Sequence, residues 1–160
     1  MKQFFFLLLF VMAQQIAQSQ LLQKMDADAL AAYITHSQKP LVVSFWATWC
    51  ASCNEELPYF ISTIKEKYKD SVELLLVSLD IKSYYPQKIT AFADKKNYNV
   101  PLAWMSESNA DIFCPKIDPK WSGAIPSTLM VNNKTRYRKF YETGLSPLQF
   151  EKSLRDLVGL

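Results

Sequence analysis

The sequence predicts a single α/β domain with a central mixed β-sheet and helices on both of its faces. The length of 160 residues suits one compact domain with one hydrophobic core. Hydrophobic residues make up 49 % of the chain, which indicates a folded protein rather than a disordered one. Between residues 41 and 79, an apolar run, a helical pattern and a second apolar run follow one another. This order is that of a strand–helix–strand unit with parallel strands.

The first 19 residues are expected to be a secretory signal peptide. Lys2 precedes an apolar run over residues 4–13, and Ala17-Gln18-Ser19 has the small residues of a cleavage site. The run is shorter than the roughly 20 residues that a membrane-spanning helix needs. An uncleaved N-terminal anchor and a plain buried helix are the alternatives. We therefore expect an export segment over 1–19, a domain over 20–160 and a periplasmic location, where disulfide chemistry is permitted.

The strand–helix–strand unit is expected to follow a first helix. Residues 27–34 form this helix, with Asp26 as its N-cap. Residues 41–46 are apolar except for Ser44 and predict a strand that is buried on both faces. Apolar residues then recur at helical spacing between 50 and 68, which predicts a second helix. A second buried strand at 72–79 and a helix at 87–96 complete this half of the chain.

The second half is expected to add an insertion, a hairpin and a last helix. Residues 101–105 and 110–114 have the pattern of a short extra strand and helix. Strands at 128–131 and 138–141 flank the turn sequence at 132–134, which predicts a β-hairpin. The last helix covers 147–158, with Ser146 as N-cap and Pro147 at the first helical position.

Charge does not indicate a nucleic-acid partner. The formal net charge is +3, and removal of residues 1–19 with Lys2 leaves +3 − 1 = +2. The charges are spread evenly along the chain, whereas nucleic-acid binding requires a concentrated basic surface. We expect no nucleic-acid partner.

Two cysteines, Cys50 and Cys53, are placed where disulfide chemistry is favoured. The helix after the first buried strand begins at Cys50, and backbone N–H groups at a helix N-terminus have no intrahelical partner. These groups favour a thiolate, which is the nucleophile in disulfide exchange. Cys53 follows one turn deeper on the same helix face, close enough to close a small ring with Cys50. An exposed, acidic thiol and a sheltered, resolving thiol are what exchange through a mixed disulfide requires.

Two simpler interpretations of this pair are weaker. A zinc site usually needs a second pair of ligands, and only Cys114 and His36, at unrelated spacings, are left to supply them. We therefore expect no metal. A purely structural disulfide would close a loop so small that it hardly constrains the unfolded chain. Cys114 is expected to be a buried small hydrophobe, with a third redox group as the alternative, and His36 a surface residue.

The sequence around the two cysteines resembles the thioredoxin superfamily. The stretch Phe45-Trp46-Ala47-Thr48-Trp49-Cys50-x-x-Cys53 is similar to the superfamily's active site, and Glu56-x-Pro58 after it is similar to the TlpA/ResA-type extracytoplasmic disulfide reductases. The stretch Gly123-Ala124-Ile125-Pro126-Ser127-Thr128 is similar to the second signature of that family, whose proline is cis. The resemblance covers residues 41–160 and implies a thioredoxin-like fold, with the extra strand and helix at 100–116 as the family's insertion.

The resemblance also implies roles for individual residues. Cys50 would attack the substrate and Cys53 would resolve the mixed disulfide, so that the two form the redox disulfide. Pro126 in cis would bring the backbone of Ile125 beside Cys50, where it would pair with an extended substrate segment. Trp49 would shield the disulfide and form part of the docking surface.

The sequence departs from the usual thioredoxin pattern at Ser44. Many thioredoxins have a buried aspartate at that position, and a serine does not act as a carboxylate base. Glu56 is then the nearest acidic group, because it lies three residues after Cys53 on the same helix. We expect an apolar wall of Trp46, Phe45 and Pro126 to raise the pKa of Glu56 and make it a better proton acceptor at neutral pH.

The function expected from the resemblance is reduction of disulfides in exported proteins, including apocytochrome c as a candidate substrate. The partners would be protein dithiols or disulfides and a membrane-embedded thiol electron donor, and no cofactor is expected. A periplasmic oxidase or isomerase would use the same residues in another direction. A non-catalytic binding module on the same fold would show no thiol exchange. A peroxide-reducing enzyme would need a peroxidatic cysteine signature, which is not visible.

Overall fold

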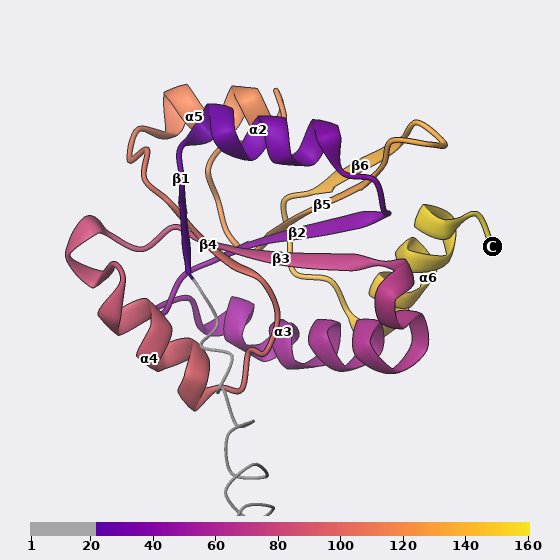
Figure 1. Ribbon diagram of the computed structural model, residues 1–160, viewed down its shortest axis with the longest axis horizontal. Coiled ribbons are helices and arrows are strands. Elements are labelled where there is room, and N and C mark those ends of the chain that lie inside the picture. The colour runs from indigo at the N-terminus through magenta and orange to yellow at the C-terminus, as the bar shows by residue number, and fades with distance from the viewer. Residues whose placement is uncertain (1–21) are drawn as a thin grey trace, which may run out of the picture.

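The computed structural model describes residues 22–160, and these fold into a six-stranded mixed sheet between two layers of helices (Figure 1). The expected export segment, residues 1–19, lies outside the described residues. The strands are β1 (Gln23–Met25), β2 (Leu41–Trp46), β3 (Glu73–Ser78), β4 (Leu102–Met105), β5 (Ser127–Asn132) and β6 (Tyr137–Tyr141). The helices are α2 (Ala27–His36), α3 (Ala51–Thr63), α4 (Gln87–Lys95), α5 (Ala110–Ile117) and α6 (Pro147–Val158).

The strand order is β1-β4-β3-β2-β5-β6. The first four strands in this order are parallel, and β5 and β6 run antiparallel to their neighbours. The predicted β2–α3–β3 unit and the β5–β6 hairpin are therefore both present. The predicted fold class is confirmed.

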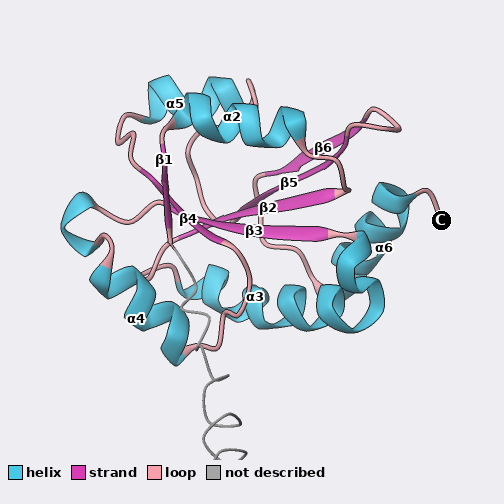
Figure 2. Cartoon of the chain, viewed as in Figure 1, coloured by secondary structure: helices cyan, strands magenta, loops and turns pink. Residues whose placement is uncertain are grey.

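The alternating side chains of β2 divide the core into two layers. Val42 and Trp46 pack with α3, α4 and α6, whereas Val43 and Phe45 pack with α2 and α5 on the other face. Figure 2 shows the two helical layers on opposite sides of the strands. All six side chains of β2 are buried, as its almost continuous apolar sequence predicts.

Local sequence signals set most helix ends where they were expected. Asp26 caps α2 by accepting a hydrogen bond from the Ala29 N–H. Ser146 and Gln149 form a capping box at the start of α6, with Pro147 at its first turn. The active-site helix differs from the prediction at its C-terminal end, because α3 ends at Thr63 and a short π-helical segment continues over Ile64–Tyr68.

The strand β1 was not predicted. It has only three residues, two of them exposed, and forms the edge of the sheet beside β4. So short a segment shows no alternation of apolar and polar residues from which it could be recognised. No helix within residues 22–160 is long and apolar enough to cross a membrane.

Candidate active site

The redox centre lies where β2 ends and α3 begins. Cys50 is the N-cap of α3, and a disulfide joins it to Cys53 with a Cα–Cα distance of 5.3 Å. The Cys50 sulfur accepts a hydrogen bond from the Cys53 backbone N–H at 3.2 Å. Cys53 is completely buried, whereas Cys50 retains 5 % exposure. Cys50 is thus less exposed than the sequence suggested, but it is the cysteine that solvent reaches.

Asp80 anchors the loop that carries Cys50, a role that the sequence analysis missed. Its buried carboxylate accepts hydrogen bonds from the Thr48 N–H at 3.0 Å, the Thr48 hydroxyl at 2.7 Å and the Ser78 hydroxyl at 2.8 Å. The Trp104 indole N–H donates to the Asp80 carbonyl at 2.7 Å. The signal for this site was an aspartate two residues after the end of β3, at the carboxyl edge of the parallel strands.

Asn54 fixes the first turn of α3 from inside. Its side-chain amide donates to the Cys50 carbonyl at 2.8 Å and to the Thr48 carbonyl at 3.3 Å. Its side-chain oxygen accepts from the Tyr98 hydroxyl at 2.9 Å. Burial raises the pKa of Tyr98 to about 12, so the hydroxyl keeps its proton and remains a donor. These contacts hold the backbone on both sides of Cys50.

Glu56 is a buried carboxyl group one turn beyond Cys53, with only 9 % of its surface exposed. Its Oε2 accepts a hydrogen bond from the Leu145 backbone N–H at 2.9 Å, and its buried Oε1 has no protein partner. Burial raises the pKa of Glu56 to about 7, and the Leu145 N–H opposes this rise. The group therefore changes protonation near neutral pH.

The predicted apolar wall around Glu56 is wrong for one of its three residues, Phe45. Phe45 points to the other face of the sheet, where it packs against Trp121 of the α2–α5 layer. Successive residues of a strand face opposite sides, so Phe45 and Trp46 do not line the same site. Pro126 does lie near Glu56: a Cβ added to Gly144 would be 3.5 Å from Glu56 Oε2 and 3.6 Å from Pro126 Cγ.

The segment before β5 reaches the same edge of the sheet as the cysteines. Phe45 pairs with Ser127 in antiparallel register, so the residues before Ser127 lie beside those after Trp46. The peptide bond between Ile125 and Pro126 is cis, as expected. The Trp121 indole N–H donates to the Ala124 carbonyl at 2.9 Å, and this hydrogen bond ties the segment before β5 to Trp121.

Glu142, which directly follows β6, fastens the same segment, and no sequence pattern predicted this role. Its carboxylate accepts from the Ser122 N–H at 2.8 Å, from the Ser122 hydroxyl and from the Ala124 N–H at 3.3 Å. The hydrogen bond from the Ser122 hydroxyl is the main cause that lowers the pKa of Glu142, so the carboxylate stays ionised and remains an acceptor.

A groove with a volume of about 340 Å³ opens at Trp49, the residue before Cys50. Trp49 and Ile125 line it, together with the Leu79–Lys82 segment after β3 and the start of the β4–α5 insertion. Two large apolar side chains at its rim are exposed, Trp49 by 67 % and Ile81 by 63 %. Exposed apolar surface of this kind marks a site of interaction with another molecule.

Cys114 and His36 belong to helices other than α3, namely α5 and α2 respectively. Cys114 is buried in α5, and burial is the main cause that raises the pKa of its thiol to about 11. This environment agrees with the expected role as a small hydrophobe, because a buried thiol is a poor nucleophile. His36 is exposed in the last turn of α2. Among the described residues, no cluster of three or more His, Cys, Asp or Glu side chains has the arrangement of a metal site.

Comparison with known proteins places the chain among thioredoxin-like proteins. A family model described as AhpC/TSA family matches residues 14–139. The thiol-disulfide oxidoreductase ResA of Oceanobacillus iheyensis is 25 % identical over 120 residues, which cover 75 % of this chain and 58 % of the relative. The sporulation thiol-disulfide oxidoreductase A of Bacillus subtilis is 24 % identical over 119 residues, covering 74 % of this chain and 67 % of the relative.

Solved structures of similar proteins share the fold. A thioredoxin-related protein from Neisseria meningitidis serogroup B has a TM-score of 0.64 at 21 % identity, covering 78 % of this chain and 88 % of the other. StoA from Bacillus subtilis has a TM-score of 0.54 at 22 % identity, covering 77 % and 84 %. The chain spans about half the length of some curated relatives, such as 48 % of the thiol-disulfide oxidoreductase ResA of Bacillus subtilis. The predicted thioredoxin-like resemblance is confirmed.

Proposed function

The chain belongs to the AhpC/TSA family, and we propose that it is an extracytoplasmic thiol–disulfide oxidoreductase that reduces disulfides of exported proteins. The observation that carries the proposal is the Cys50–Cys53 disulfide at the N-terminus of α3, with the Cys53 N–H directed at the Cys50 sulfur at 3.2 Å. A disulfide across two residues at a helix N-terminus is arranged for exchange, because the N–H groups stabilise the thiolate that exchange releases.

The reaction follows from the exposure of the two sulfurs. In the reduced protein, the Cys50 thiolate attacks a substrate disulfide, forms a mixed disulfide and releases one substrate thiolate. Cys53 then gives up its proton and attacks the Cys50 sulfur, which reforms the Cys50–Cys53 disulfide and releases the second substrate thiolate. Two electrons pass from the protein to the substrate, and the released thiolates take up protons. Cys53, which is completely buried, is suited to the second step only.

Glu56 is the proposed acceptor of the Cys53 proton. It lies one helical turn from Cys53, and its pKa of about 7 suits proton exchange at neutral pH. Trp49, Ile125 and Pro126 are the proposed substrate-binding residues. An extended substrate segment would lie across the groove and pair with the backbone at Ile125.

The direction and the partners also belong to the proposal. The groups that hydrogen-bond to the Cys50 sulfur, the Cys53 N–H and the Ser52 hydroxyl, are neutral, so they stabilise the thiolate less than a charged donor would. A dithiol of this kind is a reductant, whereas strong oxidants owe their potential to a stabilised reduced form. Exported protein disulfides, including those of apocytochrome c, are the substrates, and a membrane-embedded thiol protein supplies the electrons.

Alkylation and trapping test the assigned roles. In the reduced protein, iodoacetamide should label Cys50 much faster than Cys53, as followed by mass spectrometry. Cys53→Ala should accumulate mixed disulfides through Cys50, whereas Cys50→Ala should accumulate none. Cys114→Ala is the matched control and should leave both results unchanged. Equal labelling rates, or trapping through Cys53, would refute the assignment.

A further inference from the structure

A second cavity, of about 310 Å³, lies between α3 and the turn that precedes α6. The first half of α3, from Ser52 to Tyr59, forms one wall, and the 144–147 turn before α6 forms the other. It shares no lining residue with the groove at Trp49. A substrate can therefore occupy the groove without filling this cavity.

Glu56 is a buried side chain in the wall of this cavity. The residue lines the cavity, although its side chain is nine-tenths buried and its Oε1 has no protein partner. The Leu145 N–H holds Oε2 at 2.9 Å, and the neighbouring Gly144 has no side chain that would intervene. A buried carboxyl group with one free oxygen is unusual, because buried polar atoms normally have partners.

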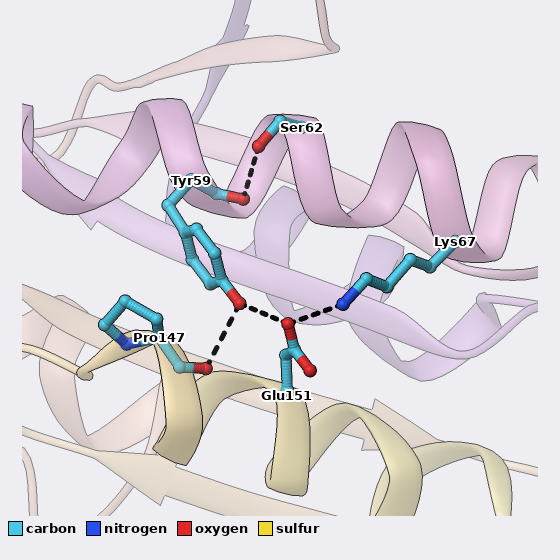
Figure 3. Close-up of polar contacts among 5 residues, drawn as sticks. All are labelled: Tyr59, Ser62, Lys67, Pro147 and Glu151. Carbon is cyan, nitrogen blue, oxygen red and sulfur yellow. Dashed lines mark hydrogen bonds and ion pairs between the residues drawn. The ribbon is translucent and has the colours of Figure 1, made fainter.

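The walls of the cavity are fixed by contacts between α3 and α6. The Tyr59 hydroxyl donates to Glu151 at 2.5 Å and lies 3.4 Å from the Pro147 carbonyl, and Lys67 contacts the same Glu151 oxygen at 2.6 Å (Figure 3). Phe60 of α3 stacks on Phe150 of α6 with ring centroids 3.7 Å apart. These contacts fix α6, and with it the turn at 144–147, against α3.

The proton that leaves Cys53 needs a route to solvent. In the mixed disulfide, the substrate is bonded to Cys50 and covers the groove, and Cys53 is completely buried. The titratable side chains around the cavity are Glu56, Glu55 and Tyr59, all from α3, and the 144–147 turn adds none. Glu56 is the buried one among these three, and it lies one helical turn from Cys53.

We propose that the cavity between α3 and the 144–147 turn is the route by which Glu56 exchanges its proton with solvent while a substrate occupies the groove, and that it admits small carboxylates. The proposal rests on the function proposed above. During resolution, Cys53–SH transfers its proton to Glu56 and its thiolate attacks Cys50. The substrate leaves as a thiolate, and Glu56 then releases the proton to water in the cavity.

Chemical rescue tests this route. Reduced Glu56→Ala would be reacted with a model disulfide to form the mixed disulfide on Cys50, and formation of the Cys50–Cys53 bond would be followed in stopped flow. Loss of the base should slow this step about 100-fold, the lower end of general-base contributions. Formate and acetate should restore the rate at least about tenfold, and the bulkier pivalate should not.

Three variants make the test specific. Glu56→Gln should be slow and insensitive to formate, because its amide fills the site. Gly144→Ala combined with Glu56→Ala should reduce the rescue, because the added methyl group lies 3.5 Å from the wild-type position of Oε2. Glu66→Ala removes an exposed glutamate elsewhere and should behave as wild type. If Glu56→Ala does not fold, Glu56→Ser gives the same comparison.

The outcomes separate the two proposals. Failure of the wild type to form a mixed disulfide on Cys50 would refute the proposed function itself. A normal rate in Glu56→Ala would refute the role of Glu56 as proton acceptor and with it the route. A slow Glu56→Ala that no small carboxylate rescues, or a rescue that Gly144→Ala leaves unchanged, would overturn the route alone. Size-dependent rescue that Gly144→Ala weakens supports it.

Discussion

Replacement of Glu56 by glutamine should change how the stability of the protein depends on pH. Burial raises the pKa of this carboxyl group from its ordinary value of 4.5 to about 7 in the folded state. Between these two values the folded protein binds more protons than the unfolded chain, so its stability falls as pH rises. At 1.36 kcal/mol per pH unit, the loss between 4.5 and 7 amounts to about 3 kcal/mol.

Glu56→Gln removes this titration while it keeps the shape of the side chain and the acceptor for the Leu145 N–H. The variant should therefore gain about 3 kcal/mol relative to wild type when the pH is raised from about 4 to about 8. Urea unfolding of the oxidised proteins across this range measures the difference. Glu55→Gln, at the exposed neighbouring position, is the matched control and should show a constant difference. Parallel stability curves for wild type and Glu56→Gln would refute the account of Glu56 as a desolvated base.

Three further substitutions test the parts that hold the site. Asp80→Ala should destabilise the protein by about 3 kcal/mol, because it strands the buried Ser78 hydroxyl and the half-buried donors of Thr48. Exposed Asp70→Ala should have little effect, and an equal effect of the two would contradict the anchor role. Trp49→Ala should change the free energy of unfolding by less than about 0.5 kcal/mol, because the side chain is exposed. It should lower kcat/KM for a protein disulfide about tenfold, and a small aromatic disulfide is the comparison substrate. Gly123→Ala should lower the free energy of unfolding by about 1–2 kcal/mol, because Gly123 has a φ of +94° and an added Cβ would lie 3.4 Å from Ala110. Thermal unfolding measures this loss, and an unchanged Tm would contradict it.

Strong local patterns allowed most of the fold to be predicted from the sequence. The continuous apolar run of β2 and the capping residues Asp26 and Ser146 placed their elements to within a residue or two. The position of Cys50 at a helix N-terminus also followed from the chain, since a buried strand ends shortly before it and a helical pattern begins there. These signals are local, and tertiary contacts did not override them.

The parts that escaped prediction depend on contacts between distant segments. Asp80 reaches Thr48 across 32 positions of sequence, and Leu145 reaches Glu56 across 89, so no local pattern reports either contact. The misplacement of Phe45 has a different cause. Both Phe45 and Trp46 are buried, and which of the two faces α3 follows from the strand's orientation in the sheet.

The reduction potential of the Cys50–Cys53 couple tests the central claim most directly. The protein would be equilibrated with a series of glutathione redox buffers, and the thiol and disulfide forms quantified by alkylation and mass spectrometry. Because the groups that hydrogen-bond to the Cys50 sulfur are neutral, we predict a reversible two-electron couple nearer the thioredoxin value of about −270 mV than the value of about −120 mV for a strong oxidant. A value near −120 mV would contradict the proposed direction, and the absence of any reversible couple at these two cysteines would contradict the proposed activity.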